Sequence, residues 1–123
     1  MVKFTIRGTL PGLNELIEAE RTHRQKGAAL KKKCETVVMH SARALGKWRA
    51  ETPVYMVYHW YEPNRRRDKD NISSFGRKVI QDALVKSRHL PNDGWNNIVG
   101  FEDRFEVDKK NPRVVVEIQE VEE

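Results

Sequence analysis

The stretch Val54–Tyr61, with the sequence VYMVYHWY, decides the fold of this chain. β-branched and aromatic residues occupy both of its alternating faces, and His59 interrupts its apolar character. Such residues favour strands, and a strand that is apolar on both faces is typical of the middle of a sheet covered on two sides. We therefore predict a central strand here, with other elements packed on both of its faces.

This strand leads through Pro63 and Asn64 into Arg65–Asn71, with the sequence RRRDKDN. Consecutive guanidiniums suit phosphate oxygens, which they bind bidentately without losing their charge. If the segment is extended, Asp68 and Asp70 point to one side with their Cβ atoms roughly 7 Å apart. Mg²⁺ binds between such oxygens while keeping most of its waters. Two interpretations stay open: a phosphodiester-cleaving metal site, or a solvated loop whose Asp70 or Asn71 caps the next helix.

Upstream of the central strand, the pattern predicts one strand and two helices. Residues 2–7 alternate between apolar and polar side chains, which is the period of a half-buried strand. A short helix carrying Leu13, Leu16 and Ile17 is expected to be capped by Asn14 and broken or bent at Gly27. A second helix is expected from Ala28 up to Pro53. Cys34 lies on its apolar stripe, which favours a core residue over a nucleophile.

Downstream, the pattern predicts a helix and two strands. After Asn71, apolar residues at i, i+3, i+7 and i+11 predict a core-facing helix stripe, consisting of Ile72, Phe75, Val79 and Ala83. Residues 91–94 signal a turn, 98–105 and 114–118 resemble strands, and 118–123 are expected to fray. Elements of both types without regular alternation predict a single α+β domain over residues 1–123, with a mixed sheet.

Charge and composition favour a polyanionic partner. The 123 residues are 38% hydrophobic and 33% charged, with a formal net charge of +5 and a pI of about 9.5. Residues 1–50 hold eleven Lys/Arg against four acids, so the basic surface comes from the first part of the chain. A lone cysteine, no signal-peptide pattern and no apolar run of membrane length lead us to expect a cytoplasmic protein.

The acids most available for a shared site are Asp68, Asp70 and Asp93. The third lies in the turn after a helix of about seventeen residues, which spans some 25 Å, so the turn has to carry it back. On spacing alone, Asp93 fits an ordinary turn aspartate. For Arg21, Arg24 and Lys26, both DNA contact and simple solvation remain open. The single cysteine and the histidine spacing do not favour a zinc site.

Three motifs together resemble the RusA family of Holliday junction resolvases. Arg-Arg-Arg-Asp-Lys-Asp-Asn at 65–71 is followed by Lys-Val-Ile-Gln-Asp-Ala-Leu at 78–84, and then by Asn92-Asp93. That family is similar in size and carries an R-R-D-x-D-N segment, a K-x-x-x-D-A-L helix and a short acidic turn in this order. The likeness covers residues 64–99 well. The acidic turn here has one carboxylate where the family usually has a pair of aspartates.

The resemblance implies a homodimeric, Mg²⁺-dependent endonuclease that nicks two strands of a four-way DNA junction, with Mn²⁺ as a possible substitute metal. By position, Asp68, Asp70 and Asp93 match the metal-binding catalytic acids, and Lys78 matches the active-site lysine. The basic residues expected to bind DNA are Arg65, Arg66, Arg67, Lys69, Arg77, Arg21, Arg24 and Lys26.

Two alternatives stay open at this stage. A non-catalytic nucleic-acid-binding module explains the charge and the arginines but gives the paired aspartates no role. A nuclease for flaps, forks or other branched DNA explains all of these features equally well.

Overall fold

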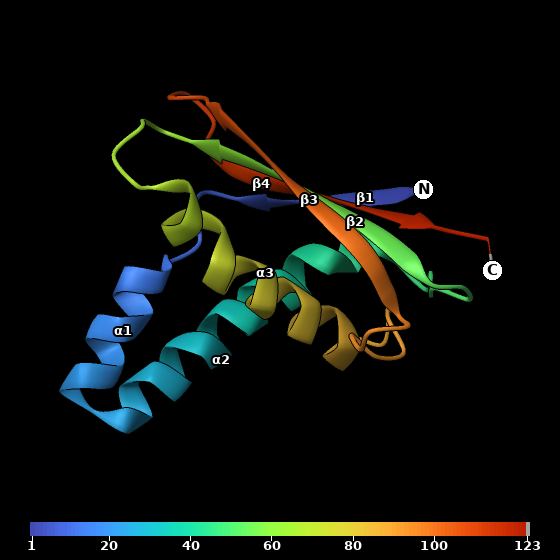
Figure 1. The fold of residues 1–123 in the computed structure, drawn as a ribbon, viewed down its shortest axis with the longest axis horizontal. Coiled ribbons are helices and arrows are strands. Elements are labelled where there is room, and N and C mark those ends of the chain that lie inside the picture. The colour runs from blue at the N-terminus through green and yellow to red at the C-terminus, as the bar shows by residue number, and fades with distance from the viewer. Residues whose placement is uncertain (123) are drawn as a thin grey trace.

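In the computed structural model, which describes residues 1–122, three helices lie beneath one four-stranded sheet (Figure 1). The order of strands and helices matches the α+β order expected from the sequence. The elements are β1 (Val2–Arg7), α1 (Leu13–Thr22), α2 (Arg24–Ser41), the 3₁₀ helix η1 (Ala42–Leu45), β2 (Val54–Glu62), α3 (Lys69–Lys86), β3 (Ile98–Val107) and β4 (Arg113–Glu120).

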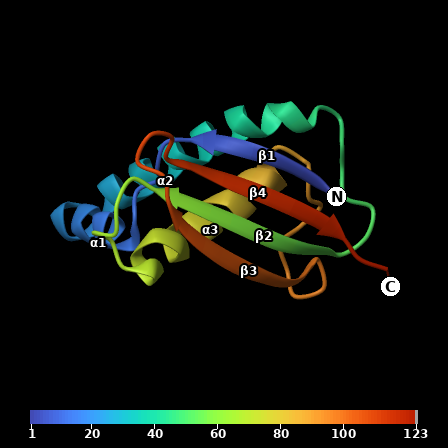
Figure 2. The ribbon, with the colours of Figure 1, turned by 90° about the horizontal axis from the view of Figure 1, so that it is seen from above.

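The sheet is mixed, as predicted, and its strand order is β1-β4-β2-β3 (Figure 2). β4 runs antiparallel to both β1 and β2, whereas β3 runs parallel to β2. In this register, Tyr58 of β2 lies between Val116 and Asp103. The central position expected for Val54–Tyr61 is therefore confirmed.

The prediction that β2 is covered on both faces is wrong. All three helices lie on one side of the sheet (Figure 1), where Met56, Tyr58 and Trp60 are buried. None of the helices within residues 1–122 covers the other face. There the guanidinium of Arg113 lies 3.7 Å from the centre of the Tyr61 ring. A cation over a ring shields its apolar surface and gains cation–π attraction, so aromatic residues are tolerated on this open face.

The contact between α3 and β2 fixes the core. The predicted stripe of α3 is buried, and it packs with Cys34 and Val38 of α2 in one apolar cluster. Gly76 makes the closest approach, because a Cβ atom at this position would lie 2.7 Å from the Trp60 ring. Burial raises the pKa of the Cys34 thiol, which agrees with its predicted place in the core.

Several helix boundaries differ from the sequence expectations. The break between α1 and α2 falls at His23, and Gly27 lies inside α2. A Cβ atom on Gly27 would collide with the Glu20 side chain, so glycine there allows the two helices to pack closely. α1 is capped by Gly12 instead of Asn14, and α2 with η1 ends at Leu45, well before Pro53. Sequence patterns locate such helix ends poorly, because contacts between the helices, and not the local residue order, set where each helix stops.

The carboxyl end is better ordered than expected. Residues 118–120 belong to β4, and the Val121 amide donates a hydrogen bond to the Pro53 carbonyl. The prediction of fraying from residue 118 is thus wrong for this part, and Glu123 lies outside the described residues. Within residues 1–122, no helix has the length and apolar character needed to cross a membrane.

We predict that Gly76→Ala destabilises the protein. Alanine is better than glycine inside a helix by about 1 kcal/mol, but overpacking against the buried Trp60 ring should cost about 1–3 kcal/mol. Urea denaturation should therefore show a net loss in the free energy of unfolding. The control is Ser74→Ala in the same helix, which should change stability little. A stabilised Gly76→Ala protein would mean that α3 does not approach Trp60 this closely.

Candidate functional site

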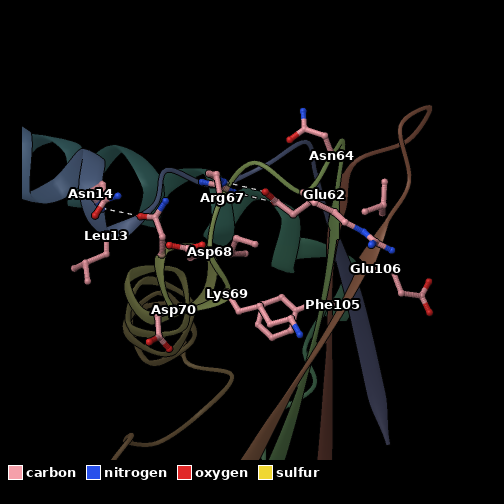
Figure 3. Close-up of a pocket in the computed structure, with 14 residues that line it drawn as sticks. Leu13, Asn14, Glu62, Asn64, Arg67, Asp68, Lys69, Asp70, Phe105 and Glu106 are labelled. Atoms are coloured by element: carbon pink, nitrogen blue, oxygen red, sulfur yellow. Dashed lines mark hydrogen bonds and ion pairs between the residues drawn. The ribbon is translucent and has the colours of Figure 1, made fainter.

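The candidate site is an open hollow of about 980 Å³ at the end of the central strand (Figure 3). Its walls come from the end of β2, the loop after it, the first turn of α3, the start of α1 and the end of β3. Asp68 and Asp70 lie on one side of the hollow, and Glu106 of β3 lies across from them (Figure 3). Segments far apart in sequence thus bring carboxylates and basic side chains to one place.

The two aspartates are not on one extended segment, contrary to the geometry assumed from the sequence. Asp68 is the N-cap residue of α3 and has extended backbone, whereas Asp70 lies in the first helical turn. Neither carboxylate has a hydrogen bond or ion pair with another part of residues 1–122, and Asp68 makes no capping bond. Both side chains are exposed. The interpretation of Asp70 as a mere helix cap is therefore wrong.

Asn71 does act as a cap, but for a different helix. Its Oδ1 accepts a hydrogen bond of 2.8 Å from the Asn14 amide, in the first turn of α1. A Cβ atom on Gly12 would lie 2.6 Å from that oxygen, so glycine is needed for the close approach. This contact fixes the start of α1 against the turn of α3 that carries Asp70.

Arg67 has a different environment from its two neighbours. Its guanidinium donates two hydrogen bonds to Glu62, of 2.9 and 2.8 Å, and a third of 3.0 Å to the Leu10 carbonyl. Arg65 and Arg66 are exposed, and their side chains have no ion pair within the described part of the chain. The sequence grouped the three arginines together, but the structure gives Arg67 an internal role and leaves the other two free for a ligand.

Two further basic residues expected to bind DNA also contact protein groups. Arg77 pairs with Asp103, donates to the Ser73 hydroxyl and lies over the Phe101 ring. Lys69 lines the hollow, and its Nζ lies 5.6 Å from the centre of the Phe105 ring. Lys69 therefore remains available at the site, whereas Arg77 holds α3 to β3.

The remaining basic candidates lie at the tip of the hairpin formed by α1 and α2. Arg21, Arg24 and Lys26 are all exposed there. α1 begins at the hollow and leads away from it (Figure 1), and its ten residues span about 15 Å. These residues are thus suited to contact a long ligand away from the hollow.

Lys78 and Asp93 form a second charged group, further along α3. The Lys78 Nζ lies 3.1 Å from Asp82 and 3.8 Å from Asp93, and Lys31 of α2 pairs with Asp82 at 2.7 Å. Lys78 is eight residues after Asp70, a rise of about 12 Å along the helix. No group of three or more His, Cys, Asp or Glu within residues 1–122 is arranged to hold a metal. One chain thus does not gather Asp68, Asp70 and Asp93 into a ready cluster.

The charges in this second group stabilise one another. Burial alone would raise the pKa of Asp82, but hydrogen bonds with Lys31 and Lys78 outweigh it and hold this pKa below its usual range. The hydrogen bond to Asp82 raises the pKa of Lys78, so Lys78 is a cation at neutral pH and not a base. The pairing contributes its full stabilisation above the ordinary pKa of an aspartate and loses it as pH falls from there through the lowered pKa of Asp82.

Sequence reasoning missed Glu62, Glu106 and the capping role of Asn71. Glu62 ends an apolar strand five residues before Arg67, and no local period marks such a pair. Glu106 belongs to a distant strand that reaches the hollow through the parallel pairing of β3 with β2. Glu62 could have been noticed as the acidic residue that directly follows the apolar strand, whereas the sequence offered no comparable sign for Glu106.

No protein-family model and no curated protein matches this chain.

Proposed function

We propose that this chain is a metal-dependent endonuclease that cleaves branched DNA, with the four-way junction as the first candidate substrate. The observation that carries the proposal is the pair of unpartnered carboxylates, Asp68 and Asp70, at the start of α3. Both carboxylates are exposed and lie at the start of the same helix, so a bound cation would find two oxygen ligands there.

The donor set fits Mg²⁺. This ion takes oxygen ligands and is usually bound through one or two carboxylates, with waters and substrate phosphates in the other positions. Asp68 and Asp70 supply two such carboxylates beside an open hollow that a phosphate can enter. When bound, the ion would activate a water and stabilise negative charge on the attacked phosphate.

The other residues of the hollow bind and position DNA in this proposal. Arg65 and Arg66 neutralise backbone phosphates next to the scissile bond, and Lys69 adds a third cation from the first turn of α3. Arg21, Arg24 and Lys26 contact the backbone further along the strand. Phosphate contacts give affinity without reading bases, which suits an enzyme that recognises the shape of DNA.

A homodimer belongs to this proposal. A four-way junction has near two-fold symmetry, so two equivalent sites related by a two-fold axis match two opposed strands. A non-catalytic DNA-binding module would account for the arginines, but it would leave Asp68 and Asp70 beside the phosphates with no role.

Asp70→Asn is expected to separate cleavage from binding. Asparagine keeps the side-chain volume but loses the charge that holds a hard cation. The variant should fold normally and bind junction DNA at least as tightly, since one negative charge has gone. It should cleave orders of magnitude more slowly, as should Asp68→Asn, with little rescue by Mn²⁺. Single-turnover cleavage and gel-shift binding measure the two properties.

Glu18→Gln, which removes an exposed acid of α1 away from the hollow, serves as the matched control and should cleave at the wild-type rate. Near-normal Mg²⁺-dependent cleavage by Asp70→Asn would show that the active site lies elsewhere.

The three neighbouring arginines should behave differently when each is changed to alanine. Arg65→Ala and Arg66→Ala should keep stability and each reduce the slope of log affinity against log salt by about 0.7–0.9. Arg67→Ala should instead destabilise the fold by about 3 kcal/mol, because it leaves buried Glu62 without its partner. Salt titrations of junction binding and urea denaturation separate the two outcomes. If Arg67→Ala instead reduced the slope of log affinity against log salt and left stability unchanged, Arg67 would be a DNA-contacting residue and not an internal one.

A further inference from the structure

The loop after η1 is fixed against the end of α3 by two hydrogen bonds to His89. The buried His89 ring donates one of 2.7 Å from Nδ1 to the Trp48 carbonyl, and the Ala50 amide donates one of 2.9 Å to the His89 carbonyl. Arg49 lies between these two contacts. The backbone on either side of Arg49 is therefore anchored beside the residues that follow α3.

Arg88 has a backbone conformation that suits glycine. α3 ends at Lys86 with Ser87 as its C-cap, so Arg88 is the first residue past the cap, and its φ is +65°. Within residues 1–122, no other residue except glycine has a positive φ. Glycine is usual at this position, because a Cβ atom is strained in the left-handed region. The chain thus keeps an arginine where glycine would fit the backbone better.

Three arginines from separate segments meet at this end of the molecule. Arg49 and Arg88 line one shallow depression, and Arg43 of η1 lines another, to which His89 also contributes. We call Arg43, Arg49 and Arg88 the end patch. All three are exposed, and their guanidiniums have no ion pair or hydrogen bond within the described part of the chain. Their charges are therefore free for a ligand.

Stabilisation of a helix end accounts for only part of this patch. A cation after α3 interacts favourably with the carbonyl end of this helix. Lys86 already supplies that charge in the last turn, and the amides of residues 87–90 donate hydrogen bonds to the carbonyls of residues 83–85. Arg43 and Arg49 do not belong to α3. A role in capping α3 thus leaves these two arginines unexplained.

We propose that the end patch binds the phosphate backbone of nucleic acid, at a site separate from the hollow. A guanidinium binds phosphate oxygens bidentately and keeps its charge. Three unpaired guanidiniums from different segments can each contact a different phosphate. Such contacts add affinity without reading bases. The formal net charge of +5 favours the same kind of partner.

The place of the end patch sets a minimum length for a DNA arm, in a step that rests on the proposed function. α3 begins at the hollow and ends at the patch (Figure 1), and its 18 residues span about 27 Å. Duplex DNA rises about 3.4 Å per base pair, so an arm that leaves the hollow along α3 reaches the patch after about eight base pairs. Shorter arms contact the hollow alone.

Arg88→Gly and Arg49→Ala test the patch. Arg88→Gly removes the guanidinium and gives the backbone its preferred residue, so the urea midpoint should stay the same or rise. Binding is measured in EDTA, which prevents cleavage, on a four-way junction with arms of about 20 base pairs. Each variant should bind more weakly and lower the slope of log affinity against log salt by about 0.7–0.9.

The matched control is Lys3→Ala, at an exposed lysine on the open face of the sheet, which should keep the wild-type affinity and slope. Wild-type affinity and slope for both Arg49→Ala and Arg88→Gly would overturn the proposal, and this is the result expected if the patch binds an acidic protein instead. A lower urea midpoint for Arg88→Gly would show that its side chain serves the fold, and would also overturn its place in the patch.

Junctions with short arms test the reach along α3. On hairpin-capped arms of about five base pairs, the double variant Arg49→Ala/Arg88→Gly should bind as the wild type does, since these arms end before the patch. Equal losses on short and long arms would overturn the path along α3. An active nuclease whose binding the double variant leaves unchanged would refute the end patch alone. A protein that binds junctions through the patch but does not cleave them with Mg²⁺ would refute the proposed function alone.

Discussion

The ion pair between Arg67 and Glu62 holds together the segments that form the hollow. It joins the end of β2 to the loop that follows, and the third hydrogen bond of Arg67 reaches the Leu10 carbonyl between β1 and α1. Charges withdrawn from water are costly unless each finds a partner, so either residue alone would disfavour this arrangement. The pair therefore fixes where the chain leaves the sheet, and with it the start of α3 that carries Asp68 and Asp70.

The single layer of helices covers the two borders of the sheet unequally. The inner residues of β1 are buried beneath it, while the inner residues of β3 extend past its cover. On the open face, long side chains of neighbouring strands shield the aromatic rings of β2, as Arg113 shields Tyr61. Side chains of the same chain thus cover aromatic surface on that face, whereas the apolar side chains at the border of β3 stay exposed to solvent.

Charges along α3 divide it into two parts with different chemistry. Its first turn carries carboxylates that have no partner among residues 1–122, next to exposed arginines. Further along, Lys31 and Lys78 both pair with Asp82, which ties α3 to α2. Negative charge is also favoured at the start of a helix by the exposed amides there. An anion such as a phosphate is therefore better accommodated at the first turn, and the second group contributes fixed charge and stability to the fold.

The sequence by itself determined the elements that depend on local period: the strand at residues 2–7, the central strand and the buried stripe of α3. It also determined the α+β order of strands and helices, because apolar and polar residues alternate with different periods in the two. The acidic and basic residues that line the hollow are read directly from the Arg65–Asn71 segment. Tertiary structure alone decided that the sheet has one open face, that Arg67 pairs with Glu62, that Asn71 caps α1, and that Asp93 joins Lys78. Each of these depends on segments distant in sequence, and packing between such segments leaves no local pattern to detect.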